Sequence, residues 1–366
     1  MSCSDDLKYW VSFARVPGIG RVRLARLKDR FGSIADVWNA CRGDLLNAGL
    51  DEKLVDGFIR VRKNISPDSE MEVLEKYHIK ALLYPSDEYP PLLREITDFP
   101  AILFVRGELK PQDETCIAVV GTRRATSYGR QVTDEVVTSL ALNRITIISG
   151  LAKGIDTAAH RAALAAKGRT LAIFACGLDI VYPPENVKLA RDILENGALI
   201  SEYPLGTKPK AEHFPQRNRI LSGLSRGVLV VEAGDTSGAL ITADFALQQD
   251  REVFAVPGSI LSPMSKGPNR LIQQGAKLVR NHIDILEELN LSEAVHQYQM
   301  QAVNVSSETE SIILKCINEG AAHIDQICRA TGLTVAAVQS SLAVMELNGI
   351  VKHVGNLNYA MNKSLV

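Results

Sequence analysis

Short apolar runs alternate with longer amphipathic stretches between Cys116 and Leu289. The apolar runs are CIAVV, ITII, TLAIFA, ALIS, VLVV, VFAV and KLV, and they are separated by loops and segments of helix length. Runs that are apolar throughout, without a period of two, are typical of strands buried on both faces. Because parallel strands are joined by crossover helices, the alternation predicts an α/β fold with an extended Rossmann-like, doubly wound and mostly parallel sheet.

The pattern changes on both sides of this segment. Toward the N-terminus, an apolar-periodic stretch to Phe13, the turn Pro17-Gly18-Ile19-Gly20 and a basic stretch through Arg30 predict a small helical domain. The Pro-rich passage YPSDEYPPLLREITDFPAILFVRG then predicts an irregular strap packed on the next domain. Toward the C-terminus, two helices, the longer over Thr334–Asn348, and a strand-turn-strand around Gly355-Asn356 suggest a winged helix. We therefore expect a helical domain over 1–75, a Rossmann-like domain over 76–292, a linker over 293–306 and a winged-helix domain over 307–366.

Composition narrows the possible functions. The 41 lysines and arginines are balanced by 42 acids, so any anion site must come from local clustering. The six cysteines have no metal-ligand or disulfide spacing, and no metal cluster or catalytic signature is visible, so we expect no metal, no cofactor and no catalytic residue. The first residues are acidic and no apolar run reaches the roughly 18 residues of a membrane span. We expect a cytoplasmic protein with no membrane contact.

Two loops that follow predicted strands have a composition typical of phosphate binding. The first holds Gly121, Thr122, Arg123 and Arg124, and the second holds Ser149, Gly150, Lys153 and Gly154. Glycine-rich turns into helices expose backbone amides to anions, and arginine adds paired contacts to phosphate. Each loop alone is equally consistent with ordinary turn and capping chemistry. Two such loops at one edge of a sheet favour a binding site.

A third cluster lies in HFPQRNRILSGLS, which begins at His213. The stretch from Thr207 to Gly227 carries one acid, Glu212, against the cations Lys208, Lys210, Arg217, Arg219 and Arg226. Single-stranded nucleic acid is bound by such combinations, because a base stacks on an aromatic ring such as Phe214 while cations hold the backbone. The alternative is that Phe214 anchors the core and the arginines pair with Glu202 or Glu232.

The motifs GTRRATSYG, SGLAKGIDTAAH, CGLDIVYPPEN, HFPQRNRILSGLS and VEAGDTSGALITADFAL occur in this order, and with them the chain resembles the bacterial DNA processing protein A family, DprA or Smf. The resemblance runs from about Tyr84 to Leu289. It implies a non-enzymatic protein that binds and protects incoming single-stranded DNA, loads the RecA recombinase in natural transformation, and forms a homodimer. It places the dimer interface near Leu247–Gln274.

The resemblance also implies DNA-binding residues. Arg123, Lys153, Phe214, Arg217, Asn218 and Arg219 are expected to line the DNA pocket, together with a lysine before Phe214. Lys210 is the nearer candidate for that lysine, and Lys208 is the alternative. Asn218 is the least defined member, because it could read a base edge or brace a neighbouring loop.

Other readings stay open. Pro17-Gly18-Ile19-Gly20 resembles a helix-hairpin-helix turn that could hold a phosphate, or it simply joins two helices. Leu333–Ile350 contains no lysine or arginine, which favours a protein contact over DNA reading for the winged helix. The main rival function is a nucleotide phosphoribohydrolase marked by PGGxGTxxE. Here the corresponding loop, Glu232–Gly238, lacks the paired glycines and the glutamate after the threonine.

Overall fold

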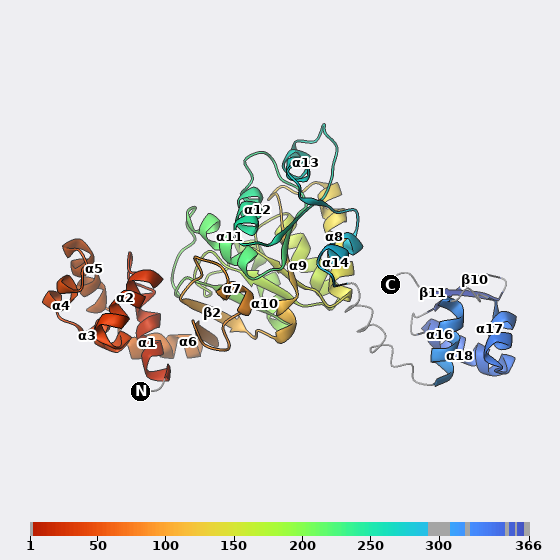
Figure 1. The fold of residues 1–366 in the computed structure, drawn as a ribbon, viewed down its shortest axis with the longest axis horizontal. Helices are drawn as coiled ribbons and strands as arrows, with labels where there is room; N and C mark the ends of the chain where they lie inside the picture. Colours follow the sequence, from red (N-terminus) through yellow and green to blue (C-terminus); the bar gives the residue numbers. More distant parts are fainter. Residues whose placement is uncertain (1–2, 292–307, 319–322, 348–350, 356, 362–366) are drawn as a thin grey trace. The chain divides into compact units, whose positions relative to one another are not determined.

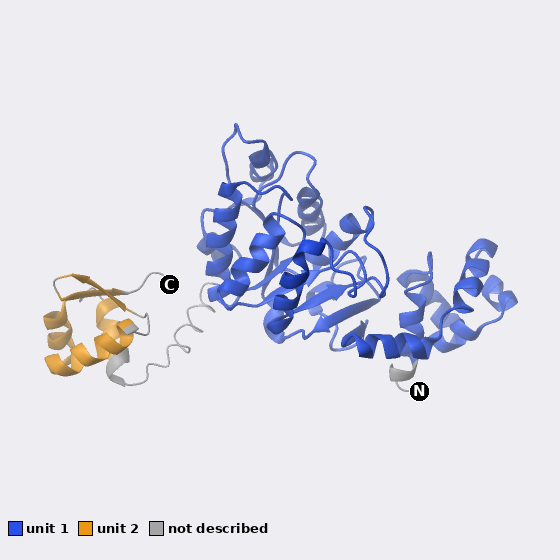
Figure 2. Ribbon diagram, turned by 180° about the vertical axis from the view of Figure 1, so that it is seen from behind, with its two compact units in different colours: residues 1–291 blue, residues 292–366 orange. Residues whose placement is uncertain are grey.

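A computed structural model describes residues 3–291, 308–318, 323–347, 351–355 and 357–361. The chain divides into two compact units, Met1–Leu291 and Ser292–Val366 (Figure 2). The first unit contains the sheet and the N-terminal helices, and the second contains the C-terminal helices and a hairpin. The predicted linker, 293–306, lies outside the described residues.

The first unit is coloured from red to teal in Figure 1. It is built around one nine-stranded sheet in the order β1-β2-β6-β5-β4-β3-β7-β8-β9. From β6 to β9 all neighbours are parallel, whereas β1 and β2 are antiparallel additions. The strands are β1 (Ile79–Leu83), β2 (Ile102–Gly107), β3 (Cys116–Val120), β4 (Thr146–Ser149), β5 (Thr170–Ile173), β6 (Gly197–Ser201), β7 (Gly227–Val230), β8 (Glu252–Ala255) and β9 (Lys277–Leu278). The seven predicted apolar runs are therefore all strands, and the predicted doubly wound, mostly parallel sheet is confirmed.

Helices cover both faces of the sheet. One face carries α8 (Ser127–Leu142), α9 (Ile155–Ala165), α10 (Val187–Glu195) and α14 (His282–Glu288). The other carries α7 (Pro91–Arg94), α11 (His213–Gly223), α12 (Gly238–Gln248) and α13 (Lys266–Gln273). Short 3-10 turns, η1 (Pro111–Glu114), η2 (Pro184–Asn186) and η3 (Pro263–Ser265), complete the connections. The change of face between β6 and β7 places β3 beside β7, so β5-β4-β3-β7-β8-β9 has the Rossmann order and its switch point lies between β3 and β7.

The Pro-rich passage departs from the predicted strap. Its last residues form β2, which pairs with β6 and with β1, the strand just before the passage, so the sheet is extended at one edge. All four prolines of the passage lie between the two strands and none interrupts the ladder, which is why both strands can form. The short helix α7 begins at Pro91, where a missing amide hydrogen costs nothing.

The N-terminal helices form their own aromatic core. They are α1 (Cys3–Phe13), α2 (Arg21–Phe31), α3 (Ile34–Asn39), α4 (Arg42–Asn47), α5 (Glu52–Arg62) and α6 (Pro67–Lys76). Phe13, Trp38 and Phe58 pack with ring centroids 5.0–5.4 Å apart, a favourable aromatic spacing. Arg15 donates to the carbonyl of Leu205, 3.0 Å away, and thereby ties these helices to the sheet. The two helices predicted on either side of Pro17-Gly18-Ile19-Gly20 are present as α1 and α2, whereas phosphate binding by this turn stays a prediction.

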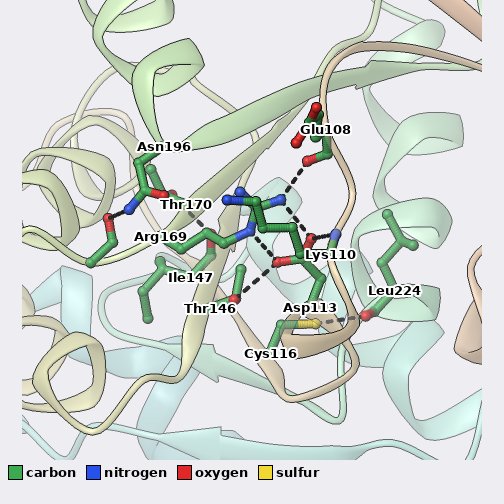
Figure 3. Close-up of polar contacts among 11 residues, drawn as sticks. Glu108, Lys110, Asp113, Cys116, Thr146, Ile147, Arg169, Thr170, Asn196 and Leu224 are labelled. Carbon is green, nitrogen blue, oxygen red and sulfur yellow. Dashed lines mark hydrogen bonds and ion pairs between the residues drawn. The ribbon is translucent and has the colours of Figure 1, made fainter.

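A buried ion pair holds the amino-terminal edge of the sheet (Figure 3). Arg169, just before β5, donates to both carboxylate oxygens of Asp113 at 2.6 and 2.8 Å and to the carbonyl of Glu108. Thr146, at the start of β4, donates to the same carboxylate at 3.1 Å. Arg169 is 4% exposed. The connection between β2 and β3 is thus fixed to the starts of β4 and β5.

The second unit contains α16 (Glu308–Asn318), α17 (Ile324–Thr331), α18 (Val335–Leu347) and the hairpin β10 (Val351–Gly355) with β11 (Asn358–Met361). The described residues of this unit contain one helix more than predicted, α16, which begins shortly after the predicted linker, 293–306. Ile327, Val338 and Leu342 are fully buried in its core. Across the described residues no single helix is long and apolar enough to cross a membrane. The bent pair α17–α18 passes that test by length and composition only.

Candidate nucleic-acid interface

A cavity of about 640 Å³ opens at the switch point of the sheet. The loop after β3 contributes Gly121, Thr122 and Arg123, and α11 contributes Phe214, Arg217 and Asn218. Further lining comes from Ala152, Asp156, Tyr182, Pro209, Lys210, Ala211, Gly234, Thr236, Ser237, Gly238, Ala239, Thr242 and Met264, among others. Open α/β sheets bind ligands beyond the carboxyl ends of their strands at such a point. The volume lies within the usual range for a ligand pocket, about 300–1,000 Å³.

The loop after β3 is held by a carboxylate from a distant part of the chain. Glu232, only 1% exposed, accepts from the Thr126 amide at 2.9 Å and from the Thr126 hydroxyl at 2.5 Å. Thr126 caps α8 by accepting from the Gly129 amide at 3.1 Å. Glu232 therefore supplies the negative charge that is favoured at the N-terminus of α8. The Thr126 amide is already hydrogen-bonded and is not free to bind a phosphate, although the composition of this loop predicted free amides. Glu232 is not among the residues that line the cavity.

The loop after β4 has a similar internal anchor. Asp156, in the first turn of α9, accepts from the amides of Gly150 and Ala152 at 3.1 and 3.3 Å. Burial raises the pKa of Asp156, while the nearby Arg217 and these amides act in the opposite direction. Asp156 is thus a loop brace, and the cap position of α9 is Gly154.

The two loops also touch each other. Gly154 has φ +81°, and a Cβ there would overlap the Thr122 carbonyl, which accepts from the Ile155 amide at 3.2 Å. A Cβ on Gly121 would overlap Ile155 and the Glu232 carbonyl. Loop packing therefore accounts for glycine at both positions, without any ligand.

Phe214 stands at the cavity wall with a cation against its ring. The Arg123 guanidinium carbon lies 5.2 Å from the Phe214 ring centroid. Tyr182 meets the same ring edge-on, with centroids 5.6 Å apart. Phe214 is partly exposed rather than a core anchor. The predicted pairing of an aromatic ring with a cation is thus present at one wall of the cavity.

Arg217 lies deeper and is 3% exposed. One of its terminal nitrogens donates to the Ile173 carbonyl at 2.5 Å, whereas its Nε has no hydrogen-bond partner among the described residues. A Cβ on Gly150 would overlap the guanidinium, so this glycine makes room for it. Burial lowers the pKa of Arg217, although a guanidinium stays protonated in proteins. The cavity therefore contains a buried positive charge whose hydrogen-bonding capacity is only partly used.

The remaining α11 residues separate into two groups. Asn218 lines the cavity and donates to the Gly238 carbonyl at 3.2 Å, which braces the neighbouring loop. Arg219 is not brought to the cavity: it bonds Glu202 at 2.5 Å and Asp98 at 3.2 Å. The alternative that an arginine pairs with Glu202 is therefore correct for Arg219, because a helix turns its neighbouring positions to different sides.

The other predicted residues are also distributed unevenly. Lys210 lines the cavity and lies 3.8 Å from Glu212, whereas Lys208 is exposed and does not line it. Lys153 is exposed and forms an ion pair with Glu185. Four more predicted residues are outside the lining: exposed Arg124, buried Ser149, which donates to the Val119 carbonyl at 2.7 Å, Gly150 and Gly154.

Sequence reasoning missed the loop after β7 as a part of the site. Thr236, Ser237 and Gly238 line the cavity, and α12 begins there with Ser237 as its cap. The signal was present in the motif VEAGDTSGALITADFAL, which ends a predicted strand and opens a helix. Tyr182 was also missed, and it follows no predicted strand directly.

The charge of the lining favours an anionic ligand. Arg123, Lys210 and Arg217 are its cations, and Asp156 is its carboxylate. An aromatic ring beside cations can bind a molecule that combines a planar ring with a phosphate. The fold and the site together define a Rossmann-like protein with a cationic, aromatic-lined cavity at its switch point.

Comparison with known proteins identifies the family. The family described as DNA recombination-mediator protein A matches residues 80–290, and the DprA winged helix domain matches 299–356. The chain is 33% identical to protein Smf of Synechocystis sp., over 97% of this chain and 99% of that protein. The X-ray structure of DNA processing protein A from Streptococcus pneumoniae superposes with a TM-score of 0.66 at 36% identity, covering 77% of this chain and 97% of that one.

A second solved structure is DNA processing protein A from Helicobacter pylori, described for its single-stranded DNA binding mode. It has a TM-score of 0.53 at 31% identity and covers 58% of this chain and 96% of its own. The chain belongs to the DNA recombination-mediator protein A family, DprA or Smf. Its C-terminal unit is a DprA winged helix domain.

Proposed function

We propose that this protein binds single-stranded DNA in the switch-point cavity. The observation that carries the proposal is the Arg123 guanidinium 5.2 Å from the Phe214 ring centroid at the wall of a cationic cavity. A base that stacks on Phe214 would take the place of Arg123, which would then be free to bind the backbone phosphate. Arg217 lines the same cavity and would supply a second, buried positive charge.

The remaining predicted residues would position the DNA strand in the cavity. Gly121, Thr122, Lys210 and Asn218 line the cavity and would contact the strand directly. Gly150, Gly154 and Ser149 would not contact the strand but would hold the shape of the loops, because each of them packs against or hydrogen-bonds other residues of the protein. Lys153 and Arg124 are exposed and would contribute only to a longer strand. Stacking and phosphate contacts tolerate any base, so little sequence preference is expected.

We further infer that the bound strand is protected and handed to the RecA recombinase in the cytoplasm during natural transformation, without catalysis. The description of the family as a DNA recombination mediator supports this role. Measuring RecA filament assembly on DNA coated with a single-strand-binding protein tests it. The protein should shorten the lag before assembly, and an unchanged lag would contradict the loading role.

A homodimer is part of the same proposal. The stretch Leu247–Gln274 contains three highly exposed apolar side chains, Leu247, Ile260 and Leu261, at 60%, 86% and 89% exposure. Such side chains grouped in one stretch are typical of a protein-protein contact. Light scattering should give twice the mass of the chain, and the Ile260→Asp, Leu261→Asp double variant should give the monomer mass. A monomeric wild type would contradict the dimer.

The stacking role of Phe214 has a direct test. Phe214→Ala should weaken the binding of single-stranded DNA by about 1–3 kcal/mol for each base that stacks on the ring. Tyr128→Ala is the matched control, because Tyr128 is an exposed aromatic that does not line the cavity. Equal affinities of the two variants in a fluorescence-anisotropy titration would show that the cavity is not the binding site.

A further inference from the structure

Helix α13 carries two cations that the predicted site did not include. Lys266 and Arg270 are spaced i, i+4 and therefore lie on one face of the helix, one turn apart. Their side chains are 57% and 47% exposed. In the single chain both side chains are therefore open to solvent.

One carboxylate faces both cations. Asp235 lies 3.8 Å from the Lys266 ammonium and 3.9 Å from the Arg270 guanidinium, and is itself 56% exposed. Exposed ion pairs of this length contribute little to stability, at most about 1 kcal/mol. A second anion can therefore replace the Asp235 carboxylate at small cost.

This cluster adjoins the cavity. Asp235 is flanked by Gly234 and Thr236, which both line the cavity. The segment that leads into α13 is fixed to the same loop, because the Ala233 amide donates to the Met264 carbonyl at 2.8 Å and the Gly267 amide donates to the Ala233 carbonyl at 2.9 Å. Met264 also lines the cavity. The two cations are therefore held in place beside one wall.

The wall formed by α11 and the segment before it has a similar pair. There Lys210 lines the cavity and lies 3.8 Å from the exposed Glu212. Cations weakly neutralised by exposed carboxylates thus occur beside two different parts of the cavity. A polyanion that crosses the cavity would meet one such group as it enters and another as it leaves.

We propose that Lys266 and Arg270 together bind one backbone phosphate of the single strand where it leaves the cavity, and that Asp235 occupies the place of this phosphate in the free protein. The inference rests on the proposed function, and it adds a second contact outside the cavity. Binding of the strand displaces the Asp235 carboxylate into solvent. Asp235 therefore weakens binding, although it belongs to the site.

The test is a salt-dependent titration of a fluorescent oligothymidine of about 20 nucleotides. Lys266→Ala and Arg270→Ala should each weaken binding about two- to fivefold at low salt, the effect of one exposed ion pair. The double variant should reduce the slope of log affinity against log salt by about 0.7, the value for one lost phosphate contact on a single strand. Asp235→Asn should bind more tightly than wild type.

The matched control is Lys277→Ala. Lys277 is 41% exposed and pairs with Glu288 at 2.6 Å, and it does not line the cavity. It should bind DNA like wild type. If Asp235→Asn does not bind more tightly, or if the α13 variants match Lys277→Ala, the inference is wrong. Weakening by Arg123→Ala in that same experiment would leave the cavity function intact, whereas no effect of Arg123→Ala would refute both.

Lys266 and Arg270 lie within the proposed dimer stretch, so the mass of each variant is measured in parallel. Direct phosphate contact predicts lower affinity at unchanged mass. Loss of affinity that occurs only with loss of the dimer would overturn it.

Discussion

Two buried arginines at opposite edges of the sheet differ in how well they are satisfied. Arg169, 4% exposed at the amino-terminal edge, bonds both oxygens of Asp113 and a backbone carbonyl (Figure 3). Arg217, 3% exposed at the carboxyl-terminal edge, donates to one carbonyl, and in the part of the chain that the structure describes its Nε has no hydrogen-bond partner. Both charges are removed from water, yet only the first is paired with a carboxylate at hydrogen-bond distance.

The difference assigns separate roles to the two edges. A buried pair with bidentate geometry fixes the protein to itself, because removing either partner leaves an uncompensated charge. A buried guanidinium beside a cavity, with no carboxylate at hydrogen-bond distance, is suited to an anionic ligand that supplies the compensating charge. We therefore expect substitutions at the amino-terminal edge to affect folding and those at the carboxyl-terminal edge to affect binding.

The largest effect is expected at Arg169. Arg169→Met leaves the Asp113 carboxylate without its charged partner and should lower the free energy of unfolding by about 3–5 kcal/mol. Urea denaturation followed by circular dichroism measures it. Where the variant is still folded, its affinity for single-stranded DNA should equal that of wild type. A stable Arg169→Met protein with impaired DNA binding would reverse the proposed division of roles.

A smaller loss of stability is expected at Arg217. Arg217→Met removes one hydrogen bond to the Ile173 carbonyl and a charge near Asp156, which keeps its two amide donors. The free energy of unfolding should fall by about 1–3 kcal/mol, the cost of one unsatisfied buried group. DNA affinity should fall more than in Arg169→Met. The proposed division of roles is wrong if Arg217→Met has a lower free energy of unfolding than Arg169→Met and also binds DNA more tightly.

The smallest effect concerns pH. His160 in α9 is fully buried, and its Nδ1 lies 2.7 Å from the Thr170 hydroxyl. Burial, and secondarily the charge of Arg217, lower its pKa to about 3, against 6.5 for an unperturbed histidine. The pKa of His160 is lower in the folded state than in the unfolded state, so the unfolded state binds more protons between pH 6.5 and 3. Protonation of His160 therefore leaves the free energy of unfolding unchanged above pH 6.5 and lowers it as the pH falls toward 3.

The measurement is the unfolding free energy between pH 7 and pH 4. His160 should contribute a slope of at most about 1.4 kcal/mol per pH unit over this window. His160→Asn should remove that contribution, whereas His78→Asn, at an exposed position, should keep it. Identical pH profiles for wild type and His160→Asn would show that His160 protonates without opposing the fold.

The sheet was predictable from the sequence, but its edge was not. Fully apolar runs identify buried parallel strands, and all seven predicted strands form. β1 and β2 were missed because the prolines around them dominated the local pattern, although neither strand contains one. Pairing of β2 with β6 is a long-range contact that no local pattern reveals.

The candidate site was predictable by residue type and less so by contact. Arg123, Lys210, Phe214, Arg217 and Asn218 do meet at one cavity, because the loops that carry them end at the same edge of the sheet. Glycine-rich loops suggested free amides, but Glu232 bonds the Thr126 amide from 106 residues further along the chain. Arg219 carries the same charge as Arg217 and faces Glu202 instead. Such partners become visible only in three dimensions.

The most direct test of the central claim compares two neighbouring arginines of one loop. Arg123 lines the cavity against Phe214, whereas Arg124 is exposed and does not line it. Affinity for single-stranded DNA is measured from low to moderate salt for wild type, Arg123→Ala and Arg124→Ala. We predict that Arg123→Ala reduces the salt slope by about 0.7 to 1 and weakens binding, while Arg124→Ala keeps the wild-type slope on a short oligonucleotide. Equal slopes for all three proteins, or a reduced slope for Arg124→Ala alone, would contradict DNA binding in this cavity.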